Sequence, residues 1–252
     1  MQAKIGSFLI SIYIWAFIVI TIFPLFLLYL MIWILVSPFD QRKIVTYYFT
    51  VLWTRLYLNI NPGWRILVEN REKIDRSGNY ILVSNHQSII DIALLLQIRI
   101  NFKWVSKIEL AKVPFVGWVI WMNDHILVRR GDRQSVIQMA EACKKSLSEG
   151  ISILMFPEGT RSGNGGLQAF KEGAFILAKE NGVSILPIVL DGANDALPRK
   201  GFWFRVNQIF TIRLLDEIDA ETVNRLDLQQ LMDYTRNEMA KVLEGIRNSQ
   251  TV

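Results

Sequence analysis

The feature of this sequence that most limits its fold is a run of 32 residues, from Ile5 to Val36, that contains no charged side chain. As one straight helix the run would be about 48 Å long, while the hydrocarbon core of a bilayer is about 30 Å thick. A segment of this length has to tilt, bend or fold back. Pro24 lies within the run and is able to bend or end a helix. The run therefore predicts either one bent membrane span or two short halves that form a re-entrant hairpin.

The residues around the run indicate how it is used. The run is longer than the roughly 7–15 apolar residues of a signal peptide and no small-residue cleavage site follows it, so we expect it to be retained. Arg42, Lys43 and Arg55 follow the run, and under the positive-inside tendency they place that side in the cytoplasm. Residues 44–58 are rich in aromatic side chains, which suits either the headgroup level of a membrane or a helix packed on the rest of the protein. We expect residues 1–58 to form membrane-anchoring helices.

The composition excludes several classes of protein. The chain has 252 residues, of which 51% are hydrophobic, and a single cysteine. This balance excludes a disordered chain, a disulfide scaffold and an ordinary cytosolic enzyme. The net charge of +5 favours an anionic partner surface, and because the basic residues are scattered, phospholipid is favoured over nucleic acid. Cys143 belongs to an apolar stripe at helical spacing, which is typical of a core residue rather than of a catalytic thiol.

The rest of the chain predicts one α/β domain. After a turn at residues 59–63, short apolar runs alternate with longer amphipathic ones, which is typical of an α/β layer fold. We expect residues 59–252 to form the catalytic domain. Its strands are expected at residues 64–69, 80–84, 102–106, 126–129, 151–156, 184–190 and 209–215, and its best-defined helices at residues 88–97, 134–148, 171–181 and 228–247.

The first candidate for chemistry is the sequence Asn-His-Gln-Ser-Ile-Ile-Asp at residues 85–91, directly after an expected strand. On a regular helix His86 and Asp91 would lie about 140° apart, so they can meet only if His86 stands in the turn before the helix. Asn85 or Ser88 is able to cap that helix. Asp91 would then hold one imidazole nitrogen and leave the other to accept a proton, the arrangement of a general base. The alternative is a structural histidine paired with a helix aspartate.

The second candidate is Phe-Pro-Glu-Gly-Thr-Arg-Ser at residues 156–162, again at the end of an expected strand, where open α/β sheets bind their ligands. Gly159 allows the backbone to approach a ligand closely, and Arg161 offers a planar fork to phosphate or carboxylate oxygens. Glu158 is placed to orient that fork or to accept a hydrogen bond from a hydroxyl. The alternative is a glycine turn with a surface Glu–Arg pair.

Further cations follow two other expected strands. Lys107 follows residues 102–106, and Arg129, Arg130 and Arg133 lie at or after the end of the strand that starts at residue 126. Cations at strand ends suit an anionic substrate, although each taken singly is equally a surface charge. His125 is the one other histidine and is expected to be structural. With no Cys cluster and no H-E-x-x-H sequence, a metal site is not expected.

From about residue 61 to 216 these motifs resemble the glycerolipid acyltransferase family, typified by bacterial 1-acyl-glycerol-3-phosphate acyltransferases. The resemblance implies that His86 is the base and Asp91 its orienting partner. It also implies a mixed, mostly parallel central sheet flanked by helices, with a membrane-embedded amino-terminal helical hairpin. Arg129 stands where the family often has an aspartate, so the choice between Arg129 and its neighbour stays open. Pro187 falls in a further block that is structural or part of an acyl channel. The implied substrate-binding residues are Lys107, Arg130, Glu158, Gly159, Thr160 and Arg161.

The expected function is a membrane-associated O-acyltransferase. It would move a fatty acyl chain from a thioester of coenzyme A or acyl carrier protein to the free hydroxyl of 1-acyl-glycerol 3-phosphate, giving phosphatidic acid. His86 would remove the hydroxyl proton, and backbone amides near the helix start would receive the developing oxyanion. We expect no cofactor, no metal and no nucleic-acid partner, and a catalytic domain on the cytoplasmic side of the cytoplasmic membrane. Two alternatives are an acyltransferase for another acceptor (lyso-ornithine lipid, glycerol 3-phosphate or a lipid A precursor) and a non-enzymatic membrane-anchored lipid-binding module.

Overall fold

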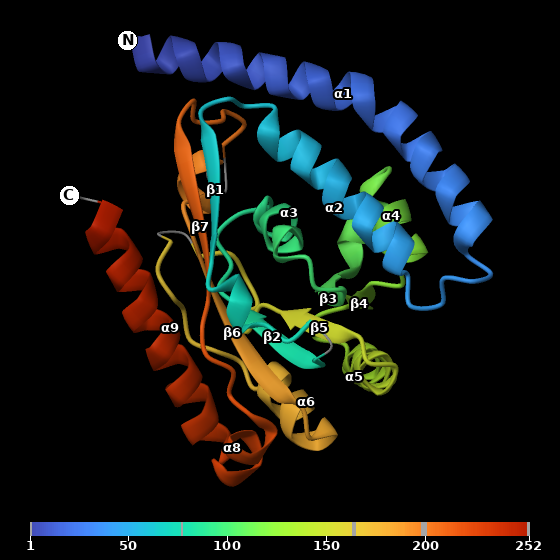
Figure 1. Ribbon diagram of the computed structural model, residues 1–252, viewed down its shortest axis with the longest axis vertical. Coiled ribbons are helices and arrows are strands. Elements are labelled where there is room, and N and C mark those ends of the chain that lie inside the picture. The colour runs from blue at the N-terminus through green and yellow to red at the C-terminus, as the bar shows by residue number, and fades with distance from the viewer. Residues whose placement is uncertain (1, 77, 163–164, 198–200, 251–252) are drawn as a thin grey trace.

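In the computed structural model, which describes residues 2–76, 78–162, 165–197 and 201–250, a seven-stranded sheet forms the centre of the molecule (Figure 1). The strand order is β1-β7-β6-β2-β5-β3-β4, and all neighbouring strands are parallel except β6 and β7. The expected mixed, mostly parallel sheet is therefore confirmed. The strands are β1 (Trp64–Glu69), β2 (Tyr80–Ser84), β3 (Phe102–Lys107), β4 (Ile126–Val128), β5 (Ser152–Met155), β6 (Ser184–Asp191) and β7 (Gln208–Leu214).

Helices cover both faces of the sheet because side chains alternate along each strand. Leu82 of β2 packs into one core, and its neighbours Ile81 and Val83 pack into the other. The first core is covered by α2 (Ile44–Asn59), α3 (Asp91–Leu95), η2 (Leu96–Ile98) and α4 (Val116–Met122). The second is covered by α5 (Arg133–Ser148), α6 (Gly173–Asn181), α8 (Ala220–Arg225) and α9 (Leu228–Gln250). Short elements complete the chain: η1 (Arg71–Lys73), η3 (Ile108–Lys112) and α7 (Ala193–Ala196).

The expected strands all occur, with ends that shift by at most one residue. The helices expected at residues 134–148 and 228–247 are α5 and α9, and the helix expected at 171–181 begins at Gly173. The helix expected from residue 88 begins later, at Asp91, because the preceding turn is held by hydrogen bonds to the Asp91 carboxylate.

The long apolar run forms one helix, α1 (Gln2–Val36), which continues through Pro24 and is bent along its length (Figure 1). Of the two alternatives for this run, the structure has the single bent helix, and the alternative of two halves that fold back at Pro24 is wrong. A proline removes one backbone donor and bends a helix, but a long run of apolar helix-compatible residues on both sides is able to continue through it.

The chain reverses after α1, at residues 37–43, and α2 then runs back beside α1 (Figure 1). Asp40 fixes the start of α2, since its carboxylate accepts the amides of Ile44 and Val45 at 2.7 and 2.8 Å. Tyr47 and Val51 of α2 are buried in the same core as the sheet. The amino-terminal helix pair thus consists of α1 and α2, and of the two alternatives for residues 44–58 the structure has the helix packed on the domain.

Most of α1 remains exposed. Val19 and Ile20 are 70% and 72% exposed, and the most apolar 18-residue window within residues 5–36 has a mean hydropathy of 2.7. By length and composition α1 is suited to cross a membrane, the one such helix in the described part of the chain. It contacts the domain at two points, where Ile14 packs in a cluster with Phe204 and where Tyr29 packs in a cluster with Met122.

Candidate active site

His86 and Asp91 are in contact at the end of β2. Strand β2 ends at Ser84 and α3 begins at Asp91, so His86 lies in the connecting turn. Nδ1 of His86 lies 2.7 Å from Oδ2 of Asp91, whose side chain is fully buried. The spacing argument predicted this arrangement, with the histidine outside the helix and the aspartate in its first turn.

The turn keeps its shape through Asp91 rather than through the expected caps. Oδ2 of Asp91 also accepts the backbone amides of the two residues after the histidine, at 2.7 and 2.9 Å. Asn85 instead exchanges two hydrogen bonds of 2.8 Å with the backbone of Leu190, and the Ser88 hydroxyl donates to the carbonyl of Leu197 at 3.0 Å. The expectation that Asn85 or Ser88 caps the helix is therefore wrong, because both side chains bind segments that follow β6 or lie within it.

The environment of the imidazole leaves one nitrogen available. The His86 ring stacks on Phe156 with centroids 4.2 Å apart, and its side chain is 22% exposed. Within the described residues Nε2 of His86 has no hydrogen-bond partner. The Asp91 carboxylate favours the tautomer in which Nδ1 carries the proton. Nε2 is then unprotonated and is able to accept a proton. The pair therefore has the geometry of a general base.

Glu158 joins the two loops of the site. It is 3% exposed, and its carboxylate accepts the amides of His86 at 2.9 Å and Gln168 at 3.0 Å. The amide of Ser162 donates to the His86 carbonyl at 2.8 Å, so the two loops are connected twice. Burial raises the pKa of Glu158 above its ordinary value, and the two amide hydrogen bonds oppose that shift. Glu158 thus holds the histidine turn in place.

The rest of the second motif forms a tight turn after β5. Gly159 has a φ of +67°, a conformation that side chains other than glycine rarely adopt, and a Cβ there would lie 3.0 Å from Nζ of Lys171. Sequence reasoning missed this lysine, which it placed only at the start of an expected helix. The Thr160 carbonyl accepts the side-chain amide of Gln168 at 3.5 Å, and Arg161 follows, half-buried.

The cationic candidates lie at one edge of the sheet. Strands β2, β5, β3 and β4 are adjacent and parallel, so their carboxyl ends lie together. Lys107 is the last residue of β3, Arg130 lies two residues after β4, and Arg161 lies in the loop after β5. Lys107 and Arg130 are exposed and, in the described part of the chain, neither has an ion-pair partner, whereas Arg129 lies 3.9 Å from Asp132. This common edge was expected from the strand-end positions.

The expected oxyanion site requires a correction. The amide of His86 donates to Glu158, and the amides of Gln87 and Ser88 donate to Asp91. These three amides are already engaged, so the prediction that amides at the start of the helix receive an oxyanion is wrong for them.

A buried polar network behind the histidine was missed by sequence reasoning. The side-chain amide of Gln87 donates to Asp191 at 3.2 Å, and its oxygen accepts the amide of Ala193, also at 3.2 Å. Arg247 of α9 donates to the same Asp191 oxygen at 3.1 Å. Three segments far apart in sequence meet here, and no local pattern in the sequence marks them as partners.

Cys143 and His125, which were expected to be structural rather than catalytic, are structural. Burial raises the pKa of the Cys143 thiol to about 12, and the residue packs in the core as expected. His125 stacks on Trp104, and burial holds its pKa well below the ordinary value. Among the described residues, no three His, Cys, Asp or Glu side chains are grouped so as to hold a metal ion.

Fold and site together define an α/β domain that carries a histidine–aspartate pair at the carboxyl edge of a mixed sheet. The sequence profile of the Acyltransferase family matches residues 65–191. The chain belongs to this family.

Similar proteins include three named 1-acyl-sn-glycerol-3-phosphate acyltransferases. The Chlamydomonas reinhardtii protein is 33% identical over 69% of this chain and 53% of its own length. A chloroplastic Arabidopsis thaliana protein is 35% identical over 62% and 44%, and the human alpha protein is 31% identical over 76% and 68%. The chain thus spans about half the length of the algal and plant relatives. The crystal structure of the 1-acyl-sn-glycerophosphate acyltransferase of Thermotoga maritima has the same fold, with a TM-score of 0.80 and 23% identity over 97% of this chain and 98% of that one.

Proposed function

We propose that this protein transfers a fatty acyl chain from an acyl thioester to the free hydroxyl of 1-acyl-glycerol 3-phosphate, which gives phosphatidic acid. The observation that carries the proposal is the His86–Asp91 pair, with Nδ1 held at 2.7 Å and Nε2 without a partner in the described residues. Membership of the Acyltransferase family and the names of the relatives support the same reaction.

In the proposed reaction, Nε2 of His86 removes the proton from the acceptor hydroxyl as that oxygen attacks the thioester carbonyl carbon. The carbon–sulfur bond then breaks, and the leaving thiolate takes the proton from the imidazolium. Asp91 stabilises the imidazolium between these steps. Atoms and charges balance without a covalent enzyme intermediate, a cofactor or a metal.

The strand-end cations are proposed to bind the acceptor phosphate. Lys107, Arg130 and Arg161 lie at or after the ends of three neighbouring strands, and a phosphate held among them would direct the glycerol hydroxyl toward His86. Arg130 is favoured over its neighbour because Arg129 already lies near Asp132. Glu158 would act by positioning the histidine turn, while Gly159 and Thr160 would form the backbone wall beside the glycerol phosphate.

The helix α1 is proposed to keep the enzyme at the membrane that holds both amphiphilic substrates. Its exposed apolar side chains fit the bilayer, while Arg42, Lys43 and Arg55 favour a cytoplasmic position for the catalytic domain. The donor would be a thioester of coenzyme A or of acyl carrier protein, delivered from the cytoplasm.

The experiment that tests this function measures thiol release by the purified full chain in detergent micelles, with palmitoyl-coenzyme A as donor. We expect release that depends on added lysophosphatidic acid and falls roughly 10²–10⁴-fold in H86A. Circular dichroism of H86A should match that of the wild type. Release with lyso-ornithine lipid, glycerol 3-phosphate or a lipid A precursor instead would reassign the acceptor. If none of these acceptors gives thiol release, the non-enzymatic binding-module alternative is left.

A further inference from the structure

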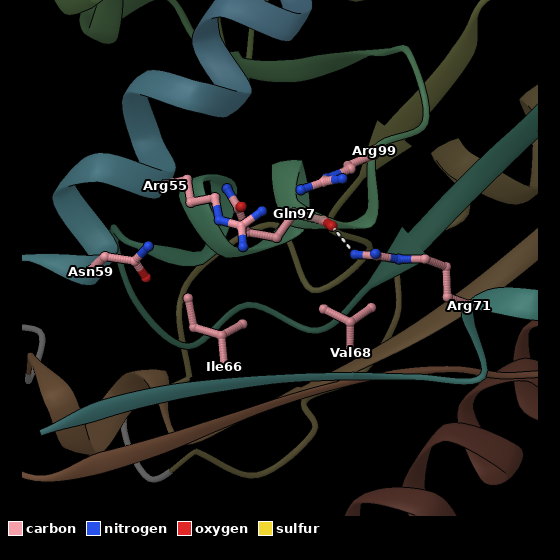
Figure 2. Close-up of a pocket in the computed structure, with 7 residues that line it drawn as sticks. All are labelled: Arg55, Asn59, Ile66, Val68, Arg71, Gln97 and Arg99. Atoms are coloured by element: carbon pink, nitrogen blue, oxygen red, sulfur yellow. Dashed lines mark hydrogen bonds between the residues drawn. The ribbon is translucent and has the colours of Figure 1, made fainter. Parts of the chain in front are cut away.

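A cavity of about 370 Å³ lies apart from the histidine pair, between α2, β1 and the segment that follows α3 (Figure 2). Ile66 and Val68 of β1 form its floor. Three arginine side chains extend over this floor: Arg55 from α2, Arg71 from η1 and Arg99 from the residue after η2 (Figure 2). The side-chain amides of Asn59 and Gln97 complete the lining.

The cavity gathers positive charge without a balancing carboxylate. None of its lining residues is acidic, and within the described residues none of the three arginines forms an ion pair. Burial lowers the pKa of Arg71, and the charges of Arg99, Arg76 and Arg55 lower it further. The three positive charges repel one another when the cavity is empty. A bound anion would attract all three and offset this repulsion.

The arginines also carry more hydrogen-bond donors than the protein satisfies. Arg71 donates to the carbonyl of Gln97, while its Nε is buried without an acceptor in the described structure. A guanidinium has five N–H donors and no acceptor, and it matches phosphate oxygens in a planar fork. The side-chain nitrogen of Gln97 is already bound to Thr54 and Ala93, so the surplus donors are those of the arginines.

We propose that this cavity binds a phosphate group, supplied either by a phospholipid headgroup or by a soluble phosphate compound. A phosphate group requires cationic hydrogen-bond donors, and the three arginines supply more of these than the protein uses. The cavity also lies next to the helix pair that carries the exposed apolar surface, and its floor is apolar. The proposal concerns a second site and does not depend on the proposed acyl transfer.

The second site is joined to the histidine pair by one short segment. Asp91 begins α3, and α3 continues through η2 to Arg99. The eight residue steps from Asp91 to Arg99 correspond to about 12–16 Å along a helical axis. A phosphate bound by Arg99 would therefore lie well away from the acceptor phosphate beside His86, at the far end of the segment that begins with Asp91.

The test compares phosphate binding by variants of the full chain in zwitterionic micelles. Binding is measured as the rise in the thermal unfolding midpoint when inorganic phosphate replaces chloride at constant ionic strength. The variants are R55Q/R99Q, R65Q and R161Q. Arg65 is the matched control, because it is an exposed β1 residue that alternates with the floor residues Ile66 and Val68. R161Q reports phosphate bound at the active-site edge instead.

We expect the phosphate concentration that gives half of the stabilisation to rise at least about tenfold in R55Q/R99Q and to change little in R65Q and R161Q. In chloride alone, R55Q/R99Q should unfold at or above the midpoint of R65Q, since repulsion has been removed. Equal phosphate responses in R55Q/R99Q and R65Q would overturn the proposal, as would a response lost only in R161Q.

A second arm distinguishes the source of the phosphate. The same proteins are unfolded in nanodiscs of phosphatidylcholine with and without phosphatidylglycerol. Stabilisation by phosphatidylglycerol that is lost in R55Q/R99Q but kept in R65Q supports a lipid headgroup. A response to inorganic phosphate alone, lost in the same double variant, supports a soluble phosphate compound. If the double variant and R65Q respond equally to inorganic phosphate, the proposal fails whatever the result in nanodiscs.

Discussion

The substitution D91N isolates the contribution of one buried negative charge to the proposed reaction. Oδ2 of Asp91 meets His86 Nδ1 at 2.7 Å and two backbone amides at 2.7 and 2.9 Å. An asparagine keeps the shape and is still able to accept from the amides. Its oxygen, at the position of Oδ2, still accepts from Nδ1 and from the two amides, so the tautomer is kept and what is lost is the charge that stabilises the imidazolium.

The expected size of the effect follows from this geometry. With charge centres about 4 Å apart and an effective dielectric constant of about 20, a carboxylate and an imidazolium attract by about 4 kcal/mol. At about 1.4 kcal/mol per tenfold in rate, loss of that stabilisation lowers kcat by about 10³-fold. General-base catalysis typically contributes roughly 10²–10⁴-fold, so the two figures agree.

The assay is thiol release from palmitoyl-coenzyme A at saturating lysophosphatidic acid, with wild type and D91N in the same micelles. The KM for lysophosphatidic acid should change little, because Asp91 is fully buried behind the imidazole. Thermal unfolding of both proteins shows that the turn still forms. If folded D91N keeps more than about a tenth of the wild-type kcat, the role given to the pair as a general base is refuted.

Three further outcomes are expected. R161A should raise the KM for lysophosphatidic acid by about 10–100-fold and leave the KM for the thioester unchanged, which steady-state kinetics in both substrates would check; a change confined to the thioester would place Arg161 at the donor. The raised pKa of Glu158 means that its contribution to stability is present below its ordinary value of 4.5 and is lost as the pH rises through the raised value. Denaturant unfolding at about pH 4 and pH 7 should therefore show the wild type losing stability relative to E158Q, and the opposite trend would contradict the assignment. V19K/I20K should lower the membrane-bound fraction in flotation assays, because each cation opposes insertion by about 2.5–3.5 kcal/mol at the bilayer centre, while Y234K on α9 should not.

The parts of the site that local spacing determines could be predicted from the sequence. A strand followed by a turn and a helix leaves few positions for His86 and Asp91, and the one arrangement that lets them meet is the one observed. Lys107 and Arg161 could be placed at one edge because parallel strands bring their carboxyl ends together.

The contacts that depend on tertiary structure could not be predicted. Asn85 and Ser88 have the chemistry of helix caps, yet they bind backbone that follows in sequence by more than a hundred residues. The effect of Pro24 depends on flanking residues that keep α1 continuous. Asp191 and its partner Arg247 meet only when α9 packs beside β6.

The arginine cavity shows the same limit. Arg55, Arg71 and Arg99 come from three separate elements, and in sequence each has the character of a scattered surface charge. The fold brings them together over the apolar floor of β1. A net charge of +5 therefore conceals a local concentration of positive charge that composition alone does not reveal.

The central claim is that His86 is the base that activates a lysophosphatidic acid hydroxyl, and single-turnover acyl transfer tests it most directly. Wild type and H86A are mixed with radiolabelled palmitoyl-coenzyme A and lysophosphatidic acid, and labelled phosphatidic acid is measured over time. The account predicts that wild type forms phosphatidic acid and that folded H86A forms it roughly 10²–10⁴-fold more slowly. Formation of phosphatidic acid by H86A at close to the wild-type rate would contradict the account.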